Sequence, residues 1–287
     1  MVLETWVAVL EKLLYCATRE ESDAIVLAMR KCIVLGLAAL GTMYAADAPV
    51  DMELMTYAEV YSAIHQQGKN TVLVYNGGTE QRGPHAVLGG HTLIARATAD
   101  AIARRLGNAL AAPVLPFSPA AGHLNPRWPG TISLSDELYA RVNEAVVDSL
   151  AVAGFRNIVL MGDHAGGQRE LAAAARRMSV KYAARGIKVI YCGAVYDTAK
   201  REFDAWLKTH GYPLGTHASI PDTSELMFLG GDAFVRKDKL AAGDGVNGVQ
   251  GDPRRSSPEL GKRYFDMKVA AAVAQIRKLE AQPVLRR

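Results

Sequence analysis

The chain has 287 residues, of which 49% are hydrophobic and 22% are charged. This composition excludes an extensively disordered or fibrous protein, and the length suits one large domain or two small ones. The formal net charge of +4 is spread along the sequence. Because nucleic-acid binding normally needs a concentrated basic stripe, we expect no nucleic-acid partner. The three cysteines, which are Cys16, Cys32 and Cys192, show no CxxC spacing, so a disulfide framework and a thiolate zinc site are both disfavoured.

The first 48 residues differ from the rest of the chain. A basic pair precedes an apolar run, 32–40, and small residues follow this run. The pattern is typical of a secretory signal peptide, and the run is shorter than the roughly 20 residues of a membrane-spanning helix. We therefore expect 29–48 to be a signal peptide or membrane-proximal segment, with 1–28 an over-extended start before a natural start at Met29. A buried amphipathic helix and a membrane anchor are the alternatives.

These expectations carry a prediction about location. On the signal-peptide interpretation, the mature protein is periplasmic or secreted and has no stable membrane span. If the segment is not a signal, the protein is cytoplasmic.

From residue 57 onward, segments typical of strands alternate with segments typical of helices. Strands are predicted at 71–75, 111–117, 157–161 and 187–192, and helices at 92–106, 133–153, 168–185, 197–210 and 258–281. The second strand contains Pro113 and Pro116, which limit its length or push it to irregular geometry. Such alternation predicts an α/β fold: a single three-layer domain over 49–287, with a mainly parallel sheet covered by helices on both faces.

Five of the seven histidines lie in segments that follow predicted strands, together with several charged residues. These post-strand residues are Glu80, Arg82, His85, His91, His123, Asp163, His164, Asp197, His217 and Asp222. In parallel sheets, ligands bind outside the carboxyl ends of the strands. Imidazole and carboxylate ligands hold a zinc-like ion, and an open coordination position activates water. Taken singly, His91 is also typical of a turn or surface residue, and Glu80 of a solvated loop carboxylate.

Five ordered motifs resemble those of the creatininase (creatinine amidohydrolase) family. Segment 77–85 is similar to the family's Gly-x-x-Glu-x-His-Gly-Pro-His motif, and segment 123–133 to its His followed by Phe-Pro-Gly-Thr-Ile. Segment 162–168 is similar to Asn-Gly-His-Gly-Gly-Asn, and segment 217–224 to His-Ala-Gly-x-x-Glu-Thr-Ser. Segment 248–253 is similar to Gly-Val-x-Gly-Asp-Pro. The resemblance implies an α/β fold, frequent homo-oligomerisation, and hydrolysis of cyclic or linear amide C–N bonds with one or two divalent metals.

The resemblance also implies a metal-ligand set, which is altered here. The family's first metal maps to Glu80, His91 and His164, with His91 in place of an Asp. The second-metal positions carry Arg82 in place of a His and, relative to creatininases proper, Gly166 in place of an acidic residue. Because an imidazole bridges two metals poorly, we expect a single ion, Zn with Fe or Mn as alternatives. The guanidinium of Arg82 would supply the positive charge of a second ion.

Roles for the remaining residues follow. Asp222 is expected to act as general base or proton shuttle, with Arg82 holding either Asp222 or a substrate carboxylate. His217 and His123 are expected to bind the substrate carbonyl or protonate the leaving nitrogen. Asp163 is an extra metal ligand or the partner that orients a His ring. The remaining predicted substrate-binding residues are His85 and Gln168.

The function expected from the sequence is therefore a metal-dependent hydrolase that cleaves an amide bond of a small-molecule substrate through a metal-activated water. Two alternatives stay open. One is a metal-free small-molecule-binding protein on the same fold, and the other is a lactone or formamide hydrolase.

Overall fold

The structure is a computed structural model that describes residues 49–243 and 245–283. All described residues except Pro49 belong to one compact unit of the chain, which begins at Val50. The predicted start extension over 1–28 and the signal peptide over 29–48 lie outside the described residues. Within the described ranges, no helix combines the length and the apolar character needed to cross a membrane.

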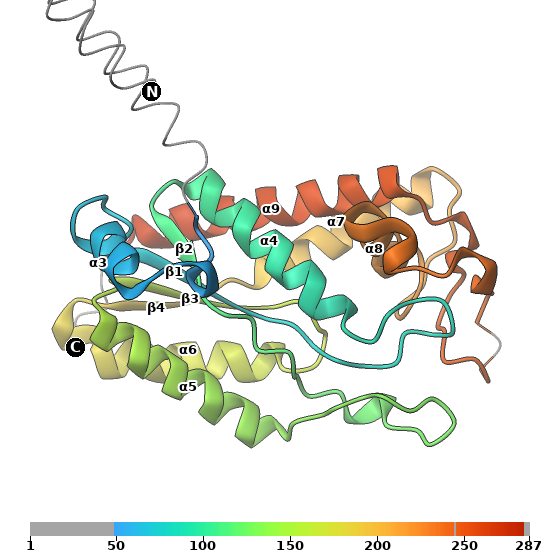
Figure 1. The fold of residues 1–287 in the computed structure, drawn as a ribbon, viewed down its shortest axis with the longest axis horizontal. Coiled ribbons are helices and arrows are strands. Elements are labelled where there is room, and N and C mark those ends of the chain that lie inside the picture. Colours follow the sequence, from blue (N-terminus) through green and yellow to red (C-terminus); the bar gives the residue numbers. More distant parts are fainter. Residues whose placement is uncertain (1–48, 244, 284–287) are drawn as a thin grey trace, which may run out of the picture. The chain divides into compact units, whose positions relative to one another are not determined.

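Four parallel strands form one sheet in the order β2-β1-β3-β4 (Figure 1). The strands are β1 (Thr71–Asn76), β2 (Ala109–Ala111), β3 (Asn157–Gly162) and β4 (Lys188–Tyr191). Thr71 pairs with Ala109 on one side and with Asn157 on the other, so β1 and β3 form the centre of the sheet. All six residues of β1 are buried, as expected for a central strand that is covered on both faces.

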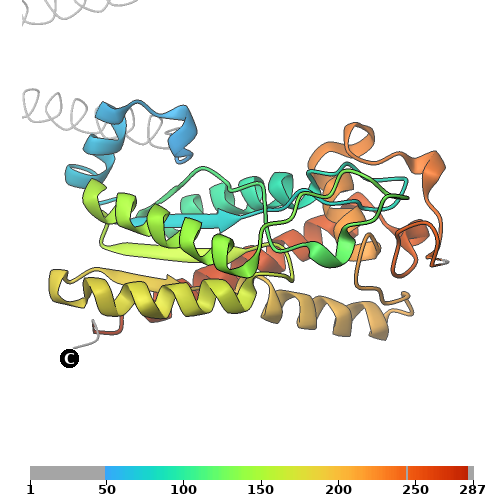
Figure 2. The same cartoon turned by 90° about the horizontal axis from the view of Figure 1, so that it is seen from below.

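Helices cover both faces of this sheet. They are α3 (Tyr57–His65), α4 (Gly90–Leu106), α5 (Asp136–Ala153), α6 (Gln168–Tyr182), α7 (Asp197–Thr209), α8 (Ile220–Gly230) and α9 (Pro258–Glu280). Helices α4 and α9 lie on one face, and α5 and α6 lie on the other (Figures 1 and 2). Alternate side chains of β1 enter the two cores: Leu73 packs on the α4–α9 side and Val72 on the α5–α6 side. The predicted three-layer α/β fold with a parallel sheet is confirmed.

Two of the predicted elements differ from the structure. The apolar run 111–117 contributes only Ala111 to a strand, because β2 covers 109–111 and the chain then leaves the sheet, as the two prolines of the run led us to expect. Pro113 and Pro116 lack the backbone N–H that a ladder requires, so the apolar run continues as irregular backbone. Helix α8 was not predicted. Most of its residues from Ile220 to Met227 are buried, so it lacks the polar face by which a surface helix is recognised.

Local sequence determines several helix ends. Helix α5 begins after Ser135, whose hydroxyl accepts a hydrogen bond from the Leu138 N–H at 3.2 Å. Helix α4 ends at Gly107, which has φ +83°, a conformation that glycine adopts without steric cost. Helix α4 also begins two residues earlier than predicted. His91 therefore lies in its first turn and not in the preceding loop.

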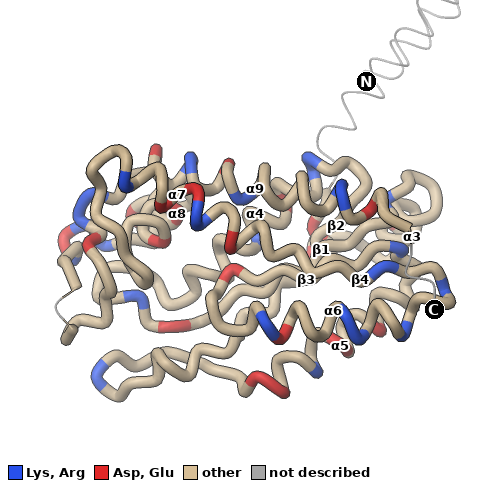
Figure 3. Tube along the Cα trace, turned by 180° about the vertical axis from the view of Figure 1, so that it is seen from behind, with Lys and Arg blue, Asp and Glu red and all other residues tan. Residues whose placement is uncertain are grey.

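The outer surfaces of α5 and α6 carry complementary charges (Figure 3). Arg177 Nε lies 2.6 Å from Glu144 Oε1, and Lys181 Nζ lies 2.7 Å from Asp148 Oδ1. Because these pairs are partly or largely exposed, they contribute little to stability. The apolar cores on the two faces of the sheet account for most of the packing energy.

Helices α8 and α9 pack against each other at unusually close range. A Cβ atom at Gly261 of α9 would lie 1.9 Å from the carbonyl oxygen of Ser224 in α8. Only glycine permits this approach, which brings side chains of α8 next to those of α9 near the carboxyl ends of the strands.

We expect Gly261→Ala to destabilise the protein by about 1–3 kcal/mol, because the added methyl group forces the two helices apart. The matched control is Gly89→Ala, since Gly89 has φ −80° and a Cβ added there would meet no atom within 4 Å. Urea denaturation of both variants measures the effect. Equal stability of the two variants would contradict the close packing of α8 on α9.

Candidate active site

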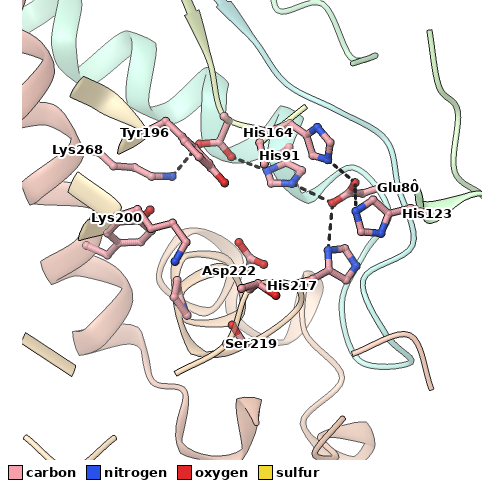
Figure 4. Close-up of a pocket in the computed structure, with 16 residues that line it drawn as sticks. Glu80, His91, His123, His164, Tyr196, Lys200, His217, Ser219, Asp222 and Lys268 are labelled. Carbon is pink, nitrogen blue, oxygen red and sulfur yellow. Dashed lines mark hydrogen bonds and ion pairs between the residues drawn. The ribbon is translucent and has the colours of Figure 1, made fainter. Parts of the chain in front are cut away.

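The candidate site lies where the order of the strands in the sheet reverses. From β1 the chain proceeds through α4 to β2 on one side, whereas β3 pairs with the other side of β1. Ligands of such open sheets bind outside the carboxyl ends of the two strands at this switch point. Glu80 and His91 follow β1, and Asp163 and His164 follow β3, so both pairs converge there (Figure 4).

A buried carboxylate forms the centre of the site. The side chain of Glu80 is 1% exposed, and ring nitrogens of four histidines surround it. Its Oε1 lies 3.0 Å from His91 Nε2 and 3.5 Å from His217 Nδ1. Its Oε2 lies 2.8 Å from His164 Nε2 and 3.6 Å from His123 Nε2. Glu80 is thus buried among imidazoles, which excludes its interpretation as a solvated loop carboxylate.

Backbone contacts hold Glu80 in place. Its N–H donates to the carbonyl of Leu88 at 3.0 Å, which closes the loop between β1 and α4. Gly77 allows this loop to pass close to α4, since a Cβ there would lie 2.6 Å from the Cα of Thr92. His91 then projects from the first turn of α4 toward the carboxylate.

A chain of ion pairs extends from His91 away from Glu80. His91 Nδ1 donates to Asp163 Oδ2 at 2.8 Å, and Lys268 Nζ donates to Asp163 Oδ1 at 2.7 Å. The same ammonium group also donates to Glu225 Oε2 at 2.7 Å. Because both oxygens of Asp163 are engaged, the structure favours its role as the partner that orients the His91 ring.

The groups in this series of ion pairs carry opposite charges next to one another, although all of the side chains are buried. Burial would raise the pKa of Asp163, but Lys268 and His91 hold it well below its usual range. Burial would lower the pKa of Lys268, but Asp163 and Glu225 raise it. Burial raises the pKa of Glu225 to about 7.

Lys268 and Glu225 were missed in the sequence. The available signal for Lys268 was its place on the apolar face of α9, four residues from Tyr264 and from Ala272.

A second ion pair joins the buried Arg82 to Asp222, whose side chain is 22% exposed and which is one of the two partners expected for Arg82. Arg82 Nη2 lies 3.1 Å from Asp222 Oδ1, and Arg82 Nη1 lies 3.6 Å from Glu80 Oε1. The other Asp222 oxygen accepts a hydrogen bond from the Ala218 N–H at 2.8 Å. Burial would raise the pKa of Asp222, but the charge of Arg82 outweighs burial and lowers it. Asp222 is therefore an ionised carboxylate at neutral pH.

The hydrogen bonds of His217 determine which of its nitrogens faces Glu80. Its Nε2 lies 2.7 Å from the carbonyl oxygen of Gln81 and 3.2 Å from the side-chain Nε2 of Gln81, and the shorter contact, to an acceptor, favours a proton on this nitrogen. In the neutral ring, Nδ1 then presents a lone pair toward Glu80. Burial and the charge of Arg82 lower the pKa of His217 to about 4, so the ring is neutral near pH 7. The His123 ring stacks on His217 with 4.1 Å between centroids.

Two predicted substrate-binding residues lie outside this cluster. His85 is fully buried, and its Nε2 lies 2.9 Å from Thr223 Oγ1. Gln168 donates to the carbonyls of Gly162 and His164 at 2.9 and 2.7 Å, so it fixes the loop that carries His164. Neither side chain lines the cavity. Their predicted contact with substrate stays a prediction.

A cavity opens beside the histidine cluster (Figure 4). Its polar lining beyond the cluster includes Asp222, Ser219, Thr216, Tyr196 and Lys200. Lys200 and Tyr196 were not singled out in the sequence, because nothing in a single sequence shows that the start of α7 lies next to the loops after β1 and β3. The cavity thus combines imidazoles and carboxylates at one end with an ammonium group at the other.

The donor groups around Glu80 fit a divalent cation. None of the described groups makes a well-angled hydrogen bond to the buried Oε2 of Glu80. His91 donates from Nδ1 to Asp163, so its Nε2 needs a proton or a metal ion to be stable beside Glu80 Oε1. Glu80, His91 and His164 offer three ligand atoms within 4.8 Å of one another, and so do Glu80, His123 and His217. Nitrogen and oxygen donors of this kind suit Zn, Fe or Mn.

Comparisons with known proteins agree with the motifs. The sequence profile of a family described as "Creatininase: creatinine amidohydrolase" matches residues 53–276. Three similar solved structures are a creatininase in its Mn form, at 20% identity, a mutant creatininase of Zn-Zn type, at 22%, and a mutant creatininase complexed with creatine, at 20%. Each has a TM-score of 0.68, and each alignment covers 82% of this chain and 100% of the other. No curated protein matches the chain significantly.

Replacing Lys268 tests the buried ion-pair chain. We expect Lys268→Met to cost about 3–5 kcal/mol of unfolding free energy, because Asp163 and Glu225 lose their shared counter-charge. Lys262→Met on the exposed face of the same helix is the control and should leave stability unchanged. Urea denaturation compares the two. A small effect at both positions would show that Asp163 and Glu225 do not depend on Lys268.

The pH dependence of stability tests the burial of His85. Burial and the charge of Arg82 lower its pKa from 6.5 to about 4, so between these values the unfolded chain binds more protons than the folded chain. Its contribution to stability is present above pH 6.5 and is lost as the pH falls toward 4. The loss is at most about 3 kcal/mol, and solvent screening makes it smaller.

In metal-stripped protein, the melting temperature of His85→Gln should therefore fall less between about pH 7 and about pH 5 than that of the wild type. His65→Ala, which changes an exposed histidine of α3, should follow the wild type. The same decline in all three proteins would contradict the assignment.

Proposed function

Because this chain belongs to the creatininase family, we propose that it is a metal-dependent amidohydrolase that cleaves a cyclic or linear C–N amide bond of a small molecule. The observation that carries the proposal is the buried Glu80 carboxylate, which faces His91 and His164 without a well-angled hydrogen bond to its Oε2. A divalent ion held there would lower the pKa of a bound water toward neutrality. The Mn and Zn-Zn forms of the similar creatininase structures support such a cofactor.

The chain's own residues account for the proton transfers. Asp222 lies on the cavity wall as an ionised carboxylate that Arg82 fixes in position, so it can accept a proton from the attacking water. His217 and His123 lie next to Glu80 on the cavity wall, where a substrate carbonyl or leaving nitrogen would be within reach. Burial lowers the pKa of both rings, so either is neutral at rest and must first accept a proton, such as one from the attacking water, before it can pass that proton to the leaving nitrogen.

The position of Lys200 supports a small polar substrate. Lys200 lines the cavity with Ser219 and Thr216, at the end away from Glu80 (Figure 4), and its ammonium group pairs with Asp204 at 2.5 Å. A substrate with an amide at the histidine cluster and an anionic or carbonyl group near Lys200 would contact both ends of the cavity.

The proposal also covers where the protein acts and how it assembles. We propose export to the periplasm or secretion, on the basis of the segment 29–48, and homo-oligomerisation, on the basis of the family. N-terminal sequencing of protein recovered outside the cytoplasm tests the first, and intact residues 1–28 would contradict it. Light scattering tests the second.

Replacing His164 tests the metal-dependent hydrolase. His164→Ala should lose bound metal and reduce hydrolysis more than about 100-fold, because it removes a ligand and not merely a group that orients one. His65→Ala is the control and should keep both properties. The assay measures metal content by mass spectrometry and turnover of cyclic amides, linear amides, lactones and formamides.

The same assay separates the alternatives. Turnover of lactones or formamides alone would assign that hydrolase chemistry. Wild-type protein that binds a small ligand but retains no metal after loading would overturn the proposal in favour of a binding protein.

A further inference from the structure

The end of the cavity away from Glu80 is formed by residues that the proposed proton transfers do not use. Tyr196 lies directly before α7, and Lys200 lies in the first turn of that helix. Ser219 lies directly before α8, and all three side chains line the cavity (Figure 4). The contacts of these three groups therefore decide which part of a substrate this end can bind.

The hydroxyl of Ser219 is a buried donor with no hydrogen-bonding partner among the described residues. Ser219 is 2% exposed, and its side chain does not cap α8. A Cβ at Gly215 would lie 2.5 Å from the Cβ of Ser219, and one at Gly251 would lie 2.9 Å from it, so both glycines make room for this side chain. The family motif His-Ala-Gly-x-x-Glu-Thr-Ser has Gly where this chain has Ser219, so the hydroxyl is an addition in this chain. A buried hydroxyl of this kind is stabilised when a ligand bonds it.

The hydroxyl of Tyr196 is a second donor in the lining. No hydrogen bond joins it to another described group, whereas the hydroxyl of Tyr75 donates to Asp163 at 3.1 Å. Burial, with the charges of Asp222 and Asp163, raises the pKa of Tyr196, so the phenol keeps its proton at neutral pH. This end of the cavity therefore offers two neutral hydroxyl donors.

Lys200 supplies the positive charge beside these hydroxyls. Its Nζ lies 2.5 Å from Asp204 Oδ2, and the two side chains are 25% and 28% exposed. Since an ammonium group has three N–H donors, Lys200 keeps donors for a second acceptor. Lys268, which also lines the cavity, is held by two buried carboxylates. Lys200 is thus the lysine of the lining that is better placed to contact a ligand.

The carboxylates near this end each have a positive partner. Asp222 lies 3.1 Å from Arg82, and Asp163 lies 2.7 Å from Lys268, so their repulsion of a negative ligand is reduced. Helices α7 and α8 both begin at this end of the cavity, and the dipole at a helix N-terminus favours an anion. One ammonium group with two hydroxyl donors suits a carboxylate, which has a single negative charge and two acceptor oxygens.

We propose that Tyr196, Lys200 and Ser219 bind a carboxylate of the substrate, so that the protein hydrolyses small amides that carry a free carboxylate besides the bond that is cleaved. N-acylated amino acids are the linear members of this class, and lactam carboxylic acids are the cyclic ones. The proposal rests on the proposed function, because it places the cleaved amide at Glu80 and the histidines. The three residues would select the substrate and would take no part in bond cleavage.

Matched probes with and without a carboxylate test the proposal. N-acetylglycine is compared with N-acetylglycinamide, and pyroglutamate with pyrrolidinone, by calorimetric binding to the metal-loaded full chain. Probes that are hydrolysed are compared by KM and kcat instead. In the wild type, each carboxylate should bind about 10-fold more tightly than its neutral partner, because its hydrogen bonds are charge-assisted. Lys200→Met should abolish this preference, with the change in KM and not in kcat, and leave the neutral probes unaffected.

Further variants separate the charge of Lys200 from folding and from binding to the metal ion. Lys200→Arg should keep the preference, whereas Tyr196→Phe and Ser219→Gly, which restores the residue of the family motif, should each reduce it. Lys208→Met changes an exposed lysine of the same helix and should bind all probes as the wild type does. A carboxylate that binds only the metal ion would keep its preference in Lys200→Met. Circular dichroism verifies folding, and Ser219→Gly carries the test should Lys200→Met be unfolded.

The remaining outcomes distinguish this proposal from the proposed function. Equal binding of charged and neutral probes by the wild type, or an undiminished preference in Lys200→Met, would overturn the carboxylate site. Tighter binding of N-acetylaminomethylphosphonate than of N-acetylglycine would overturn it in favour of a tetrahedral anion. Each of these results leaves the proposed function intact, because bound metal and turnover of neutral amides do not depend on Lys200. Wild-type protein that retains no metal after loading would contradict the proposed function itself.

Discussion

The burial of the Glu80 carboxylate is the constraint on which the rest of the site depends. Removing an ionised carboxylate from water costs several kcal/mol even after the surroundings relax. Burial would raise the pKa of Glu80, but His91, His164 and Arg82 together lower it, so the group stays ionised. The four histidines and Arg82 face this charge, and Asp163 and Asp222 each hold one of the groups that do.

The fold meets this constraint through elements that are distant in the sequence. The parallel strands β1 and β3 bring Glu80, Asp163 and His164 to one edge of the sheet. Helix α8 contributes the carboxylates of Asp222 and Glu225, and helix α9 contributes the ammonium group of Lys268. Lys268 links Asp163 to Glu225, and the ion pair of Asp222 with Arg82 forms a second link between α8 and the loop after β1. The close approach of α8 and α9 at Gly261 is what allows both helices to reach the site.

Much of this arrangement follows from the sequence. The apolar run of β3 predicts a buried parallel strand, and the rule that ligands bind at carboxyl strand ends is enough to bring His91 and His164 together. His123 and His217 come from the loops before α5 and α8, which that rule does not place. Asp222 was also one of the two partners expected for Arg82, the other being a substrate carboxylate, because a permanently charged guanidinium pairs well with a carboxylate.

The remainder was inaccessible for physical reasons. Helix α8 is buried on several sides and has no polar face, so its periodicity carries no signal. Lys268 and Glu225 were not among the candidate site residues, and their partnership depends on how α8 and α9 cross. The start of α4 at Gly90 was missed because Gly89 gives no side-chain cap. Tautomers and nitrogen orientations depend on single hydrogen bonds, such as that from His217 to Gln81, which no residue pattern specifies.

The buried guanidinium of Arg82 has a consequence for the electrostatics of the site. It places a positive charge that cannot dissociate between Glu80 and Asp222. A divalent ion on Glu80, His91 and His164 would be repelled by this charge, which would lower the affinity of the site for the ion. The ion pairs from His91 through Asp163 to Lys268 would act in the opposite direction, because they hold the His91 ring oriented toward Glu80.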